Sequence, residues 1–418
     1  LLIFWLFRLY HSLWQYASIA EVYRIAEACI IVGTGISIVM TMVIAIVYYV
    51  RLAPVYPETN RMRTLVVKSA KMTNDESTHS ANISYAMLKD WFYSLESAEV
   101  STGVSGTSYA RVTNDKEEIP TYARYTDENF FRVFPLVFLE GKPFTEADRR
   151  SGIHNVVLTD SYAQQLFGTT KGVVGKNFLM DYTNVKVVGV VKSGSFLTPD
   201  SYAQVYLPYS CRDGYDDEGS HWALGGYRVY ILMKESKSVT DVQDEVLELI
   251  RKFNVSDMGD GWKLDLVGQP ELYWHSTFRL WSNVAVDWGR VIWMFVGIFM
   301  VLLFVPAFNL SGMISARMER QLPDLGIRKA FGASRRRLLV QIIWENLLLT
   351  GLGTLLGLVI AWIVLALSGY EIFSLFEVFP KFPPKGVNLG MGIDMFFAPL
   401  LLAAFLAAFS FSFCLFSL

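Results

Sequence analysis

The sequence predicts a membrane protein with four transmembrane helices and one large α+β domain outside the membrane. Four uncharged runs, each of at least 20 residues, carry the first part of this prediction: 28–50, 291–310, 347–370 and 395–418. A helix rises about 1.5 Å per residue, so about 20 residues cross the roughly 30 Å of bilayer hydrocarbon. The 235 residues of segment 51–285 carry the second part, because they are enough for one or two folded domains.

The charges of the short loops orient these helices. Segment 317–337 holds seven Lys and Arg residues, whereas segment 369–391 holds only Lys381 and Lys385. Because cytoplasmic loops are enriched in Lys and Arg, the 317–337 loop is predicted to be cytoplasmic. Both termini then lie in the cytoplasm, and segment 51–285 lies outside it.

The predicted order of segments follows from these runs. It is an interfacial amphipathic helix (1–27), a first span (28–50), an extracytoplasmic domain (51–285), a second span with a stalk (287–316), a cytoplasmic loop (317–337), a third span (338–370), a short outer loop (371–392) and a fourth span (393–418). The interfacial helix is inferred from aromatic residues such as Trp5 and Trp14, which favour the headgroup boundary. A fifth, short membrane helix is the alternative for that segment.

Two strand-helix-strand units are predicted, one at each end of the outer domain. Their ranges are 63–70, 84–95 and 98–104 for the first, and 227–233, 239–253 and 262–267 for the second. Ser84 is a plausible helix cap, and the second helix has an apolar face. Two such units suggest one ferredoxin-like layer that is assembled from both ends of the domain.

A second, β-rich lobe is predicted to be inserted into this layer at about residues 130–225. Its expected strands are 156–161, 177–182 and 185–191. Turns are expected at the following small or polar residues: Gly168, Gly172, Gly175 and Asn184.

Residues with catalytic or metal-binding patterns were not found. The five histidines are scattered, no GxSxG turn occurs, and segment 172–177 (GVVGKN) has the wrong spacing for a phosphate loop and reads as a turn. Segment 51–285 has 25 Lys and Arg against 30 Asp and Glu, so no basic face suggests nucleic acid. We therefore expect no catalytic residue, no metal site and no enzyme activity in this chain.

The cytoplasmic loop carries a motif that is similar to a known signature. The motif RMERQLPDLGIRKAFGASRRRLLVQIIWENLLL resembles the cytoplasmic segment of MacB/FtsX-type permeases of ABC transporters. The matching residues are Arg317, Asp324, Gly326, Ile327, Arg328, Lys329, Ala330, Gly332, Ala333, Ser334, Gln341 and Glu345. Segment 156–193 is similar to the periplasmic core of the same family, through its LFG, VGK and VVGVV stretches.

The cytoplasmic motif also has a physical interpretation. Pro323 stops the preceding helix, Asp324 can cap a short new helix, and Gly332 can end it in a tight turn. This stub helix presents a compact contact surface for an ATPase, which we assign to Asp324, Gly326, Ile327, Arg328, Lys329, Phe331 and Gly332. On this helix, Arg328 and Lys329 can pair with acidic groups of the ATPase, while Ile327 and Phe331 supply an apolar contact.

Two further groups of residues are assigned to the membrane part. Arg335, Arg336 and Arg337 lie at a helix N-terminus, where the helix dipole disfavours cations, so anionic headgroups are their natural partners. They can equally serve only as topology determinants. Gly353 and Gly357, four residues apart in the third span, allow close helix packing in a dimer or within the chain itself.

The resemblance implies a permease subunit that binds no cofactor itself. A dimer of separate ABC ATPase subunits would bind ATP and magnesium, and a second permease copy or a paralogue would complete the complex. A periplasmic adaptor and an outer-membrane channel are possible further partners, together with membrane lipid. The expected location is the bacterial inner membrane, with the large domain in the periplasm and peptides, toxins, drugs or lipoproteins as exported cargo.

Two other functions remain open from the sequence. One is an FtsX-like regulator of a cell-wall hydrolase, and the other is a membrane sensor with a ligand-binding outer domain. The four uncharged runs lack the charged residues that would line a polar path. We therefore expect the spans to act as levers, with segment 287–316 forming one helix about 45 Å long.

Overall fold

The computed structural model describes mainly the large domain. It covers residues 52–298 apart from 106–107, 115–116, 196–197, 199, 217–221 and 257–260, and it also covers residues 49, 300, 301, 304, 327, 330–332, 359, 363 and 367. The chain divides into two compact units, of which the one containing Val50–Trp288 holds nearly all described residues. Within this described part, no helix is both long and apolar enough to cross a membrane. The predicted segment 1–27 and the first, third and fourth spans fall almost entirely outside the described residues.

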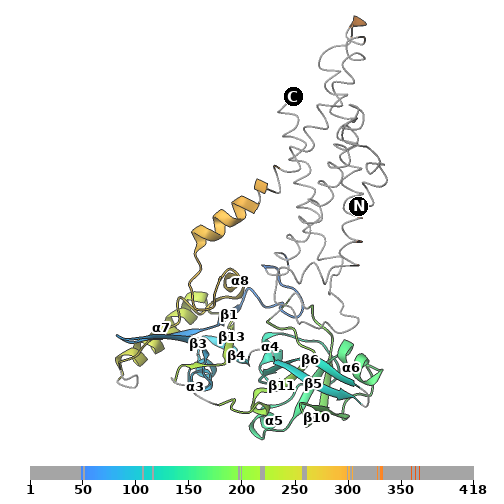
Figure 1. The fold of residues 1–418 in the computed structure, drawn as a ribbon. Helices are drawn as coiled ribbons and strands as arrows, with labels where there is room; N and C mark the ends of the chain where they lie inside the picture. Colours follow the sequence, from blue (N-terminus) through green and yellow to red (C-terminus); the bar gives the residue numbers. More distant parts are fainter. Residues whose placement is uncertain are drawn as a thin grey trace, which may run out of the picture. The chain divides into compact units, whose positions relative to one another are not determined.

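The first lobe of this unit is built on a sheet for which the described residues supply eight strands (Figure 1). They are β1 (Thr64–Val67), β2 (Ala70–Thr73), β3 (Thr78–Ile83), β4 (Ala98–Ser105), β12 (Leu224–Gly225), β13 (Tyr227–Met233), β14 (Lys263–Asp265) and β15 (Glu271–Leu272). β13 lies between β4 and β1 and is antiparallel to both, while β15 pairs with the other edge of β1. β14 and β3 flank β2 in the same way.

This strand order confirms the predicted ferredoxin-like layer. If β1 is taken as the first strand, β4 as the second, β13 as the third and β15 as the fourth, the order across this part of the sheet is fourth, first, third, second. That is the antiparallel order of a βαββαβ unit, and here its two halves come from the two ends of the domain. β14 and β2 join the sheet through β3, which pairs with the start of β13. The hairpin of β2 and β3 was not anticipated, because segment 63–70 was expected to be followed directly by a helix.

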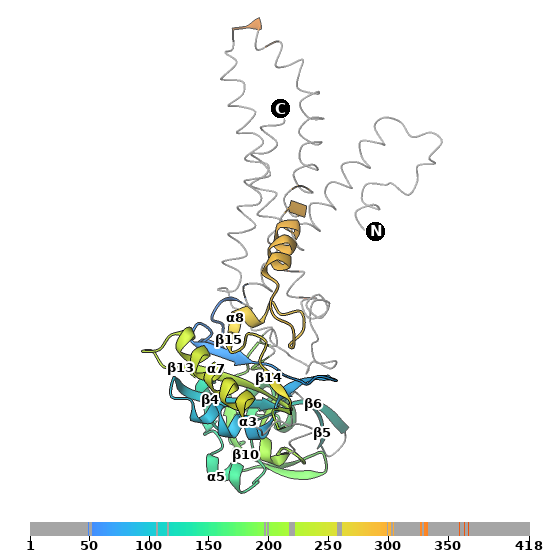
Figure 2. The ribbon, with the colours of Figure 1, turned by 90° about the vertical axis from the view of Figure 1, so that its left-hand side faces the viewer.

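Each of the two helices of this lobe begins directly after a serine whose side chain caps its first turn. α3 (Tyr85–Asp90) is capped by Ser84, whose hydroxyl accepts a hydrogen bond of 3.0 Å from the Met87 amide. It ends before residue 95, and the 3-10 turn η3 (Phe92–Ser94) follows. α7 (Val239–Val255) starts with a capping box of Ser238 and Asp241. α7 lies over the sheet (Figure 2), and its apolar residues Val242, Val246, Ile250 and Phe253 are buried.

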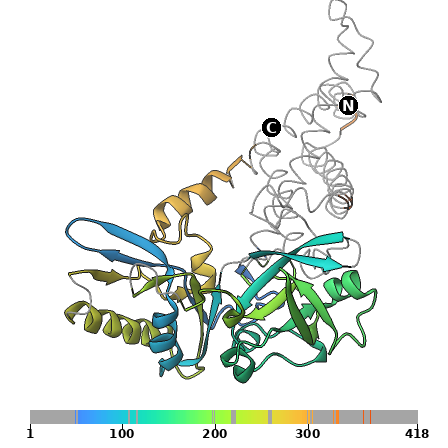
Figure 3. The same ribbon diagram turned by 60° about the horizontal axis from the view of Figure 1, so that its bottom comes forward.

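The second lobe is a closed β-barrel with one additional strand. Its described strands are β5 (Ser108–Asn114), β6 (Glu117–Thr126), β7 (Phe138–Gly141), β8 (Asn155–Thr159), β9 (Asn177–Met180), β10 (Thr183–Val191) and β11 (Val205–Pro208). Pairing runs from β10 through β8, β11, β6, β5 and β9 and back to β10, while β7 pairs only with β10 among these strands. Closure pairs the strand edges that would otherwise be exposed. Figure 3 shows the two lobes of this unit side by side.

Short helices connect or follow the strands of the second lobe. They are α4 (Phe130–Val133), α5 (Glu146–Arg150), α6 (Asp160–Phe167) and the 3-10 turn η4 (Tyr209–Cys211). Of these, α4 packs against β4 and β13 of the first lobe. α5 begins with a capping box of Thr145 and Asp148, and α6 ends at Gly168, whose φ is +70°. The barrel core consists mainly of small and β-branched residues, which suit alternating inward positions on a strand.

The strand predictions for this lobe are correct in place, with one error in a turn. β8, β9 and β10 fall in the predicted ranges, although Asp160 already begins α6. Gly172 and Gly175 have positive φ, so segment 172–177 is a turn, as expected. Asn184, however, lies inside β10 and pairs with Leu179. The hairpin turns at Asp181 and Tyr182, with φ of +44° and +63°, as a two-residue hairpin with a primed turn requires.

The predicted boundary of the second lobe, at about 130–225, differs from the structure at both ends. The second sheet begins at β5, about twenty residues earlier, and its last strand ends at Pro208. β12 already pairs with β3 of the first lobe. The hairpin of β5 and β6 has no sequence feature that assigns it to either sheet, and its pairing with β9 and β11 decides its place.

The unit ends in a short helix and the start of a longer one. α8 (Tyr273–Ser276) follows β15, and a loop then leads to a helix that begins at residue 288 and is described through residue 298. Its start agrees with the predicted helix 287–316, most of whose second half lies outside the described residues.

Candidate functional site

The predicted ATPase-coupling helix is described at only a few of its residues. Ile327 and Ala330 are helical, the Phe331 amide donates a hydrogen bond of 3.1 Å to the Ile327 carbonyl, and Gly332 has a φ of +89°. This local structure is what a short helix ending at Gly332 would have. The side chains of Ile327 and Phe331 are 57% and 88% exposed.

The other residues assigned to the membrane part lie outside the described residues. They are Asp324, Gly326, Arg328, Lys329, Arg335, Arg336, Arg337, Gly353 and Gly357. Their assigned roles therefore remain predictions.

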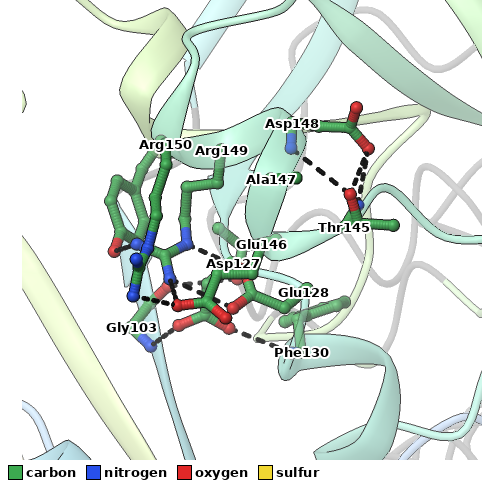
Figure 4. Close-up of polar contacts among 12 residues, drawn as sticks. Gly103, Asp127, Glu128, Phe130, Thr145, Glu146, Ala147, Asp148, Arg149 and Arg150 are labelled. Carbon is green, nitrogen blue, oxygen red and sulfur yellow. Dashed lines mark hydrogen bonds and ion pairs between the residues drawn. The ribbon is translucent and has the colours of Figure 1, made fainter.

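The described polar groups that could transmit motion lie where the two lobes meet. One is the Asp127 junction, formed by Asp127 of the second lobe with Phe130 and with Tyr93, Thr102 and Gly103 of the first. Figure 4 shows Asp127 with Phe130 and Gly103. One carboxylate oxygen of Asp127 accepts hydrogen bonds from the Thr102 hydroxyl (2.6 Å) and the Phe130 amide (3.1 Å). The other accepts them from the Tyr93 hydroxyl (2.5 Å) and the Gly103 amide (2.9 Å). A single carboxyl group thus satisfies donors on both lobes.

Asp127 is fully buried, and its hydrogen-bond donors are neutral groups. Burial raises the pKa of Asp127 from its ordinary value of 3.8 to about 6, while the hydrogen bonds from Thr102, Tyr93 and Gly103 limit the rise. The charged form of this carboxyl is therefore held by dipoles alone, without a direct cationic partner in the contacts described.

A neighbouring arginine extends the Asp127 junction (Figure 4). The Arg149 guanidinium donates to both carboxylate oxygens of Glu128, at 2.8 and 3.1 Å, and to the Tyr209 hydroxyl at 2.9 Å. The Tyr209 hydroxyl lies 3.4 Å from that of Tyr93. Burial raises the pKa of Tyr209, so this phenol stays protonated and can share hydrogen bonds with both neighbours. The paired oxygens of Glu128 fix the guanidinium plane.

The Asp200 junction is the second contact between the lobes, and its groups are charged. Asp200, from the second lobe, lies 3.1 Å from the guanidinium of Arg228 and 3.9 Å from the ammonium of Lys68, both on the first lobe. Burial alone would raise the pKa of Asp200, but Lys68, Arg228 and Arg124 hold it well below its usual range. Asp200 is therefore an anion at any physiological pH.

A second buried ion pair, Glu58 with Arg61, connects the Asp200 junction to the first and last segments of this unit. Glu58 forms an ion pair with Arg61, and its other carboxylate oxygen accepts a hydrogen bond of 2.6 Å from the Ser201 hydroxyl. Arg61 donates to the Ala53 carbonyl at 2.8 Å and lies 5.1 Å from the centre of the Tyr273 ring on α8. The segment that enters the unit, the second lobe and the helix before its exit thus meet at one buried site.

None of these junction residues was singled out from the sequence. They lie in separate segments, and no spacing connects Asp127 with Tyr93 or Asp200 with Arg228. A weak signal exists in segment 126–131 (TDENFF), where two acidic residues precede two phenylalanines with one asparagine between them. Within the described part of the chain, no three His, Cys, Asp or Glu side chains come together as a metal site would require.

Comparison with known families identifies the class of protein. Residues 28–249 match the family of MacB-like periplasmic core domains, and residues 283–418 match the FtsX-like permease C-terminal domain. Together these matches cover the chain from residue 28 to its end apart from residues 250–282. The chain belongs to the MacB/FtsX-type family of ABC transporter permeases.

Individual relatives are distant. The chain is 22% identical over 268 residues to the macrolide export ATP-binding/permease protein MacB of Escherichia coli strain K12, and the same values hold for that of Shigella flexneri. The matched segment covers 63% of this chain and 39% of each relative, so the chain spans about two fifths of their length.

Solved structures of similar proteins are also distant. The periplasmic region of MacB from Actinobacillus actinomycetemcomitans has 16% identity and a TM-score of 0.34, covering 47% of this chain and 88% of that chain. The extracellular domain of the transporter YknZ from Gram-positive bacteria has 15% identity and a TM-score of 0.32, covering 47% and 100% respectively.

Proposed function

We propose that this chain is the permease subunit of an ABC transporter in the bacterial inner membrane, and that it relays ATP hydrolysis to its periplasmic unit. The family membership supports the general class. The observation that carries the mechanism is the Asp200 junction. There Asp200 of the second lobe pairs with Arg228 of the first, and the neighbouring Ser201 donates to Glu58, which pairs with Arg61 of the entering segment. Arg61 in turn lies against the Tyr273 ring of α8, the helix before the exit. A displacement of the spans would therefore act on both lobes together.

The ATPase contact is proposed to be the stub helix that ends at Gly332. The exposed Ile327 and Phe331 side chains support an apolar contact with a partner. Arg328 and Lys329 would pair with acidic groups of that partner, with Asp324 as the helix cap and Gly326 allowing close approach. ATP and magnesium would be bound by a separate ATPase dimer, while this chain would have no catalytic role.

The arrangement in the membrane follows from the same proposal. Four spans would place both termini in the cytoplasm and the described unit in the periplasm. Arg335, Arg336 and Arg337 would bind lipid headgroups at the cytoplasmic face. Gly353 and Gly357 would pack against a second copy of the permease or a paralogue.

The cargo is proposed to be handled on the periplasmic side. The relatives named above are macrolide exporters, which supports export of drugs, peptides, toxins or lipoproteins by this chain. An adaptor and an outer-membrane channel would complete such a pathway. Because the four uncharged runs 28–50, 291–310, 347–370 and 395–418 carry no charged residue, we propose that the spans move as levers and do not form a path for polar cargo.

The ATPase contact can be tested with the substitution Arg328→Glu. We expect it to abolish co-purification of the ATPase and the permease-dependent ATPase activity, because it replaces a cation facing an acidic surface. Arg111→Glu, an exposed charge reversal on the barrel, is the matched control and should leave both unchanged. Normal complex formation and activity in the Arg328 variant would show that the contact lies elsewhere.

A further inference from the structure

The loop between α8 and the last described helix exposes an unusual number of apolar side chains. Leu280, Trp281, Val284 and Trp288 are 71%, 67%, 48% and 40% exposed. Single exposed apolar residues are common on soluble proteins, but four within nine residues form a cluster that needs a partner. Segment 280–286 (LWSNVAV) contains no charged residue.

This loop is fixed to the first lobe by polar contacts of its backbone. Arg279 forms a buried ion pair with Glu271 and donates to the carbonyls of Val284 (2.7 Å) and Val267 (2.9 Å). The Ser69 hydroxyl donates to the Ser282 carbonyl at 2.6 Å. The apolar side chains are therefore held outward by a loop of defined shape.

The cluster is continuous with the helix that precedes the uncharged run 291–310. Trp288 begins this helix and lies against α8, with its ring centre 4.9 Å from that of His275 and 5.9 Å from that of Phe278. Residue 291 follows only about 4.5 Å further along the helix axis. Trp288 thus stands within one helical turn of the predicted hydrocarbon.

We propose that Leu280, Trp281, Val284 and Trp288 form a membrane foot that inserts into the headgroup boundary of the periplasmic leaflet. This proposal rests on the proposed insertion of segment 291–310. Tryptophan and aliphatic side chains favour this boundary, and segment 280–286 carries no charge that would oppose insertion. The charged residues Asp287 and Arg290 flank Trp288, and the polar headgroup region can accommodate their charges. Lipid is the occupant that the continuity with segment 291–310 supports, whereas nothing comparable points to a second protein surface. The foot would attach the first lobe to the membrane surface at a point separate from the spans themselves.

The test measures the lipid exposure of single positions in the full chain, reconstituted in vesicles of phosphatidylethanolamine and phosphatidylglycerol. A nitroxide label is attached at Trp281→Cys in a variant whose Cys29, Cys211 and Cys414 are replaced by serine. Collision with oxygen, which concentrates in lipid, is compared with collision with a water-soluble nickel chelate. The aqueous control is Tyr182→Cys, at an exposed aromatic residue in the barrel hairpin, and the membrane control is Val296→Cys.

We expect the ratio of oxygen to nickel collisions at position 281 to be severalfold higher than at position 182. An equal ratio at these two positions, with a high ratio at position 296, would overturn the foot and leave membrane insertion intact. A low ratio at all three positions would instead overturn the proposed span. Shielding of position 281 from both reagents would mean that a protein surface covers the cluster, and this result would also overturn the lipid assignment.

Discussion

The two junctions between the lobes hold a buried carboxylate in opposite ways. Asp127 is surrounded by neutral donors, and its pKa is raised to about 6. Asp200 lies among Lys68, Arg228 and Arg124, and its pKa is lowered. Both groups are almost inaccessible to water, so the difference comes from the charge of their partners. One lobe boundary thus contains a carboxyl whose contribution to stability increases as the pH falls and a carboxyl whose contribution is insensitive to pH near neutrality.

The largest loss of stability is expected when the negative charge of the Asp200 junction is removed. Asp200→Asn leaves Lys68 and Arg228 without their buried anion. Because the Arg228 side chain is 42% exposed and water partly screens its charge, we expect the free energy of unfolding to fall by about 3 kcal/mol, at the lower end of the range for a broken buried pair. Urea unfolding of the full chain in detergent, followed by circular dichroism, measures it. Glu118→Gln is the control, since this side chain is exposed and should change stability by less than about 0.5 kcal/mol. Equal effects of the two variants would show that the Asp200 pairing adds no stability.

The next effect concerns the pH dependence that Asp127 imposes. Because its folded-state pKa lies above the ordinary value of 3.8, the folded state binds the proton more tightly than the unfolded state does. Its contribution to stability is therefore complete below pH 4 and is lost as the pH rises through 6, by about 3 kcal/mol.

Asp127→Asn should remove this dependence. As the pH falls from 7 to 4.5, the wild type should gain stability relative to the variant, so the free energy of unfolding of the wild type minus that of the variant should increase. Asp200 does not interfere in this range, since its lowered pKa makes its contribution fall only in stronger acid. A difference that stays constant with pH would contradict the raised pKa of Asp127.

A smaller effect is expected from the arginine beside the Asp127 junction. Arg149→Lys cannot reproduce the two parallel hydrogen bonds to Glu128 or the contact with the Tyr209 ring, so we expect a loss of about 1–2 kcal/mol. Arg150→Lys is the matched control on the same helix. Arg150 is exposed and pairs only with Glu146 among its described contacts, so its substitution should cost less than about 0.5 kcal/mol. Similar losses in both variants would exclude a special role for the paired geometry.

The smallest effect tests whether the two junctions act independently. Asp127 and Asp200 share no hydrogen-bond or ion-pair partner among the described contacts. The losses in Asp127→Asn and Asp200→Asn should therefore add to within about 0.5 kcal/mol in the double variant. A larger deviation would show that the lobes shift together when either junction is weakened, which would strengthen the lever proposal.

Local elements of this protein follow from its sequence alone. Ser84 caps α3 as predicted, Ser238 caps α7 directly before the predicted start of that helix at residue 239, and β13 spans the predicted range 227–233. Gly168 ends α6 with a positive φ. Each of these features depends on interactions within a few residues, such as a hydroxyl that satisfies a free helix amide, so neighbouring side chains are sufficient to specify it.

The tertiary structure decided which distant segments meet. β5 and β6 belong to the barrel because β9 and β11 pair with them, and the hairpin turns at Asp181 and Tyr182 because the register of β9 and β10 requires it. Asp127 and Asp200 become junction groups only when the first lobe supplies their donors and cations. Burial and partner charge depend on the complete fold, so no spacing along the chain could assign one carboxyl a raised pKa and the other a lowered one.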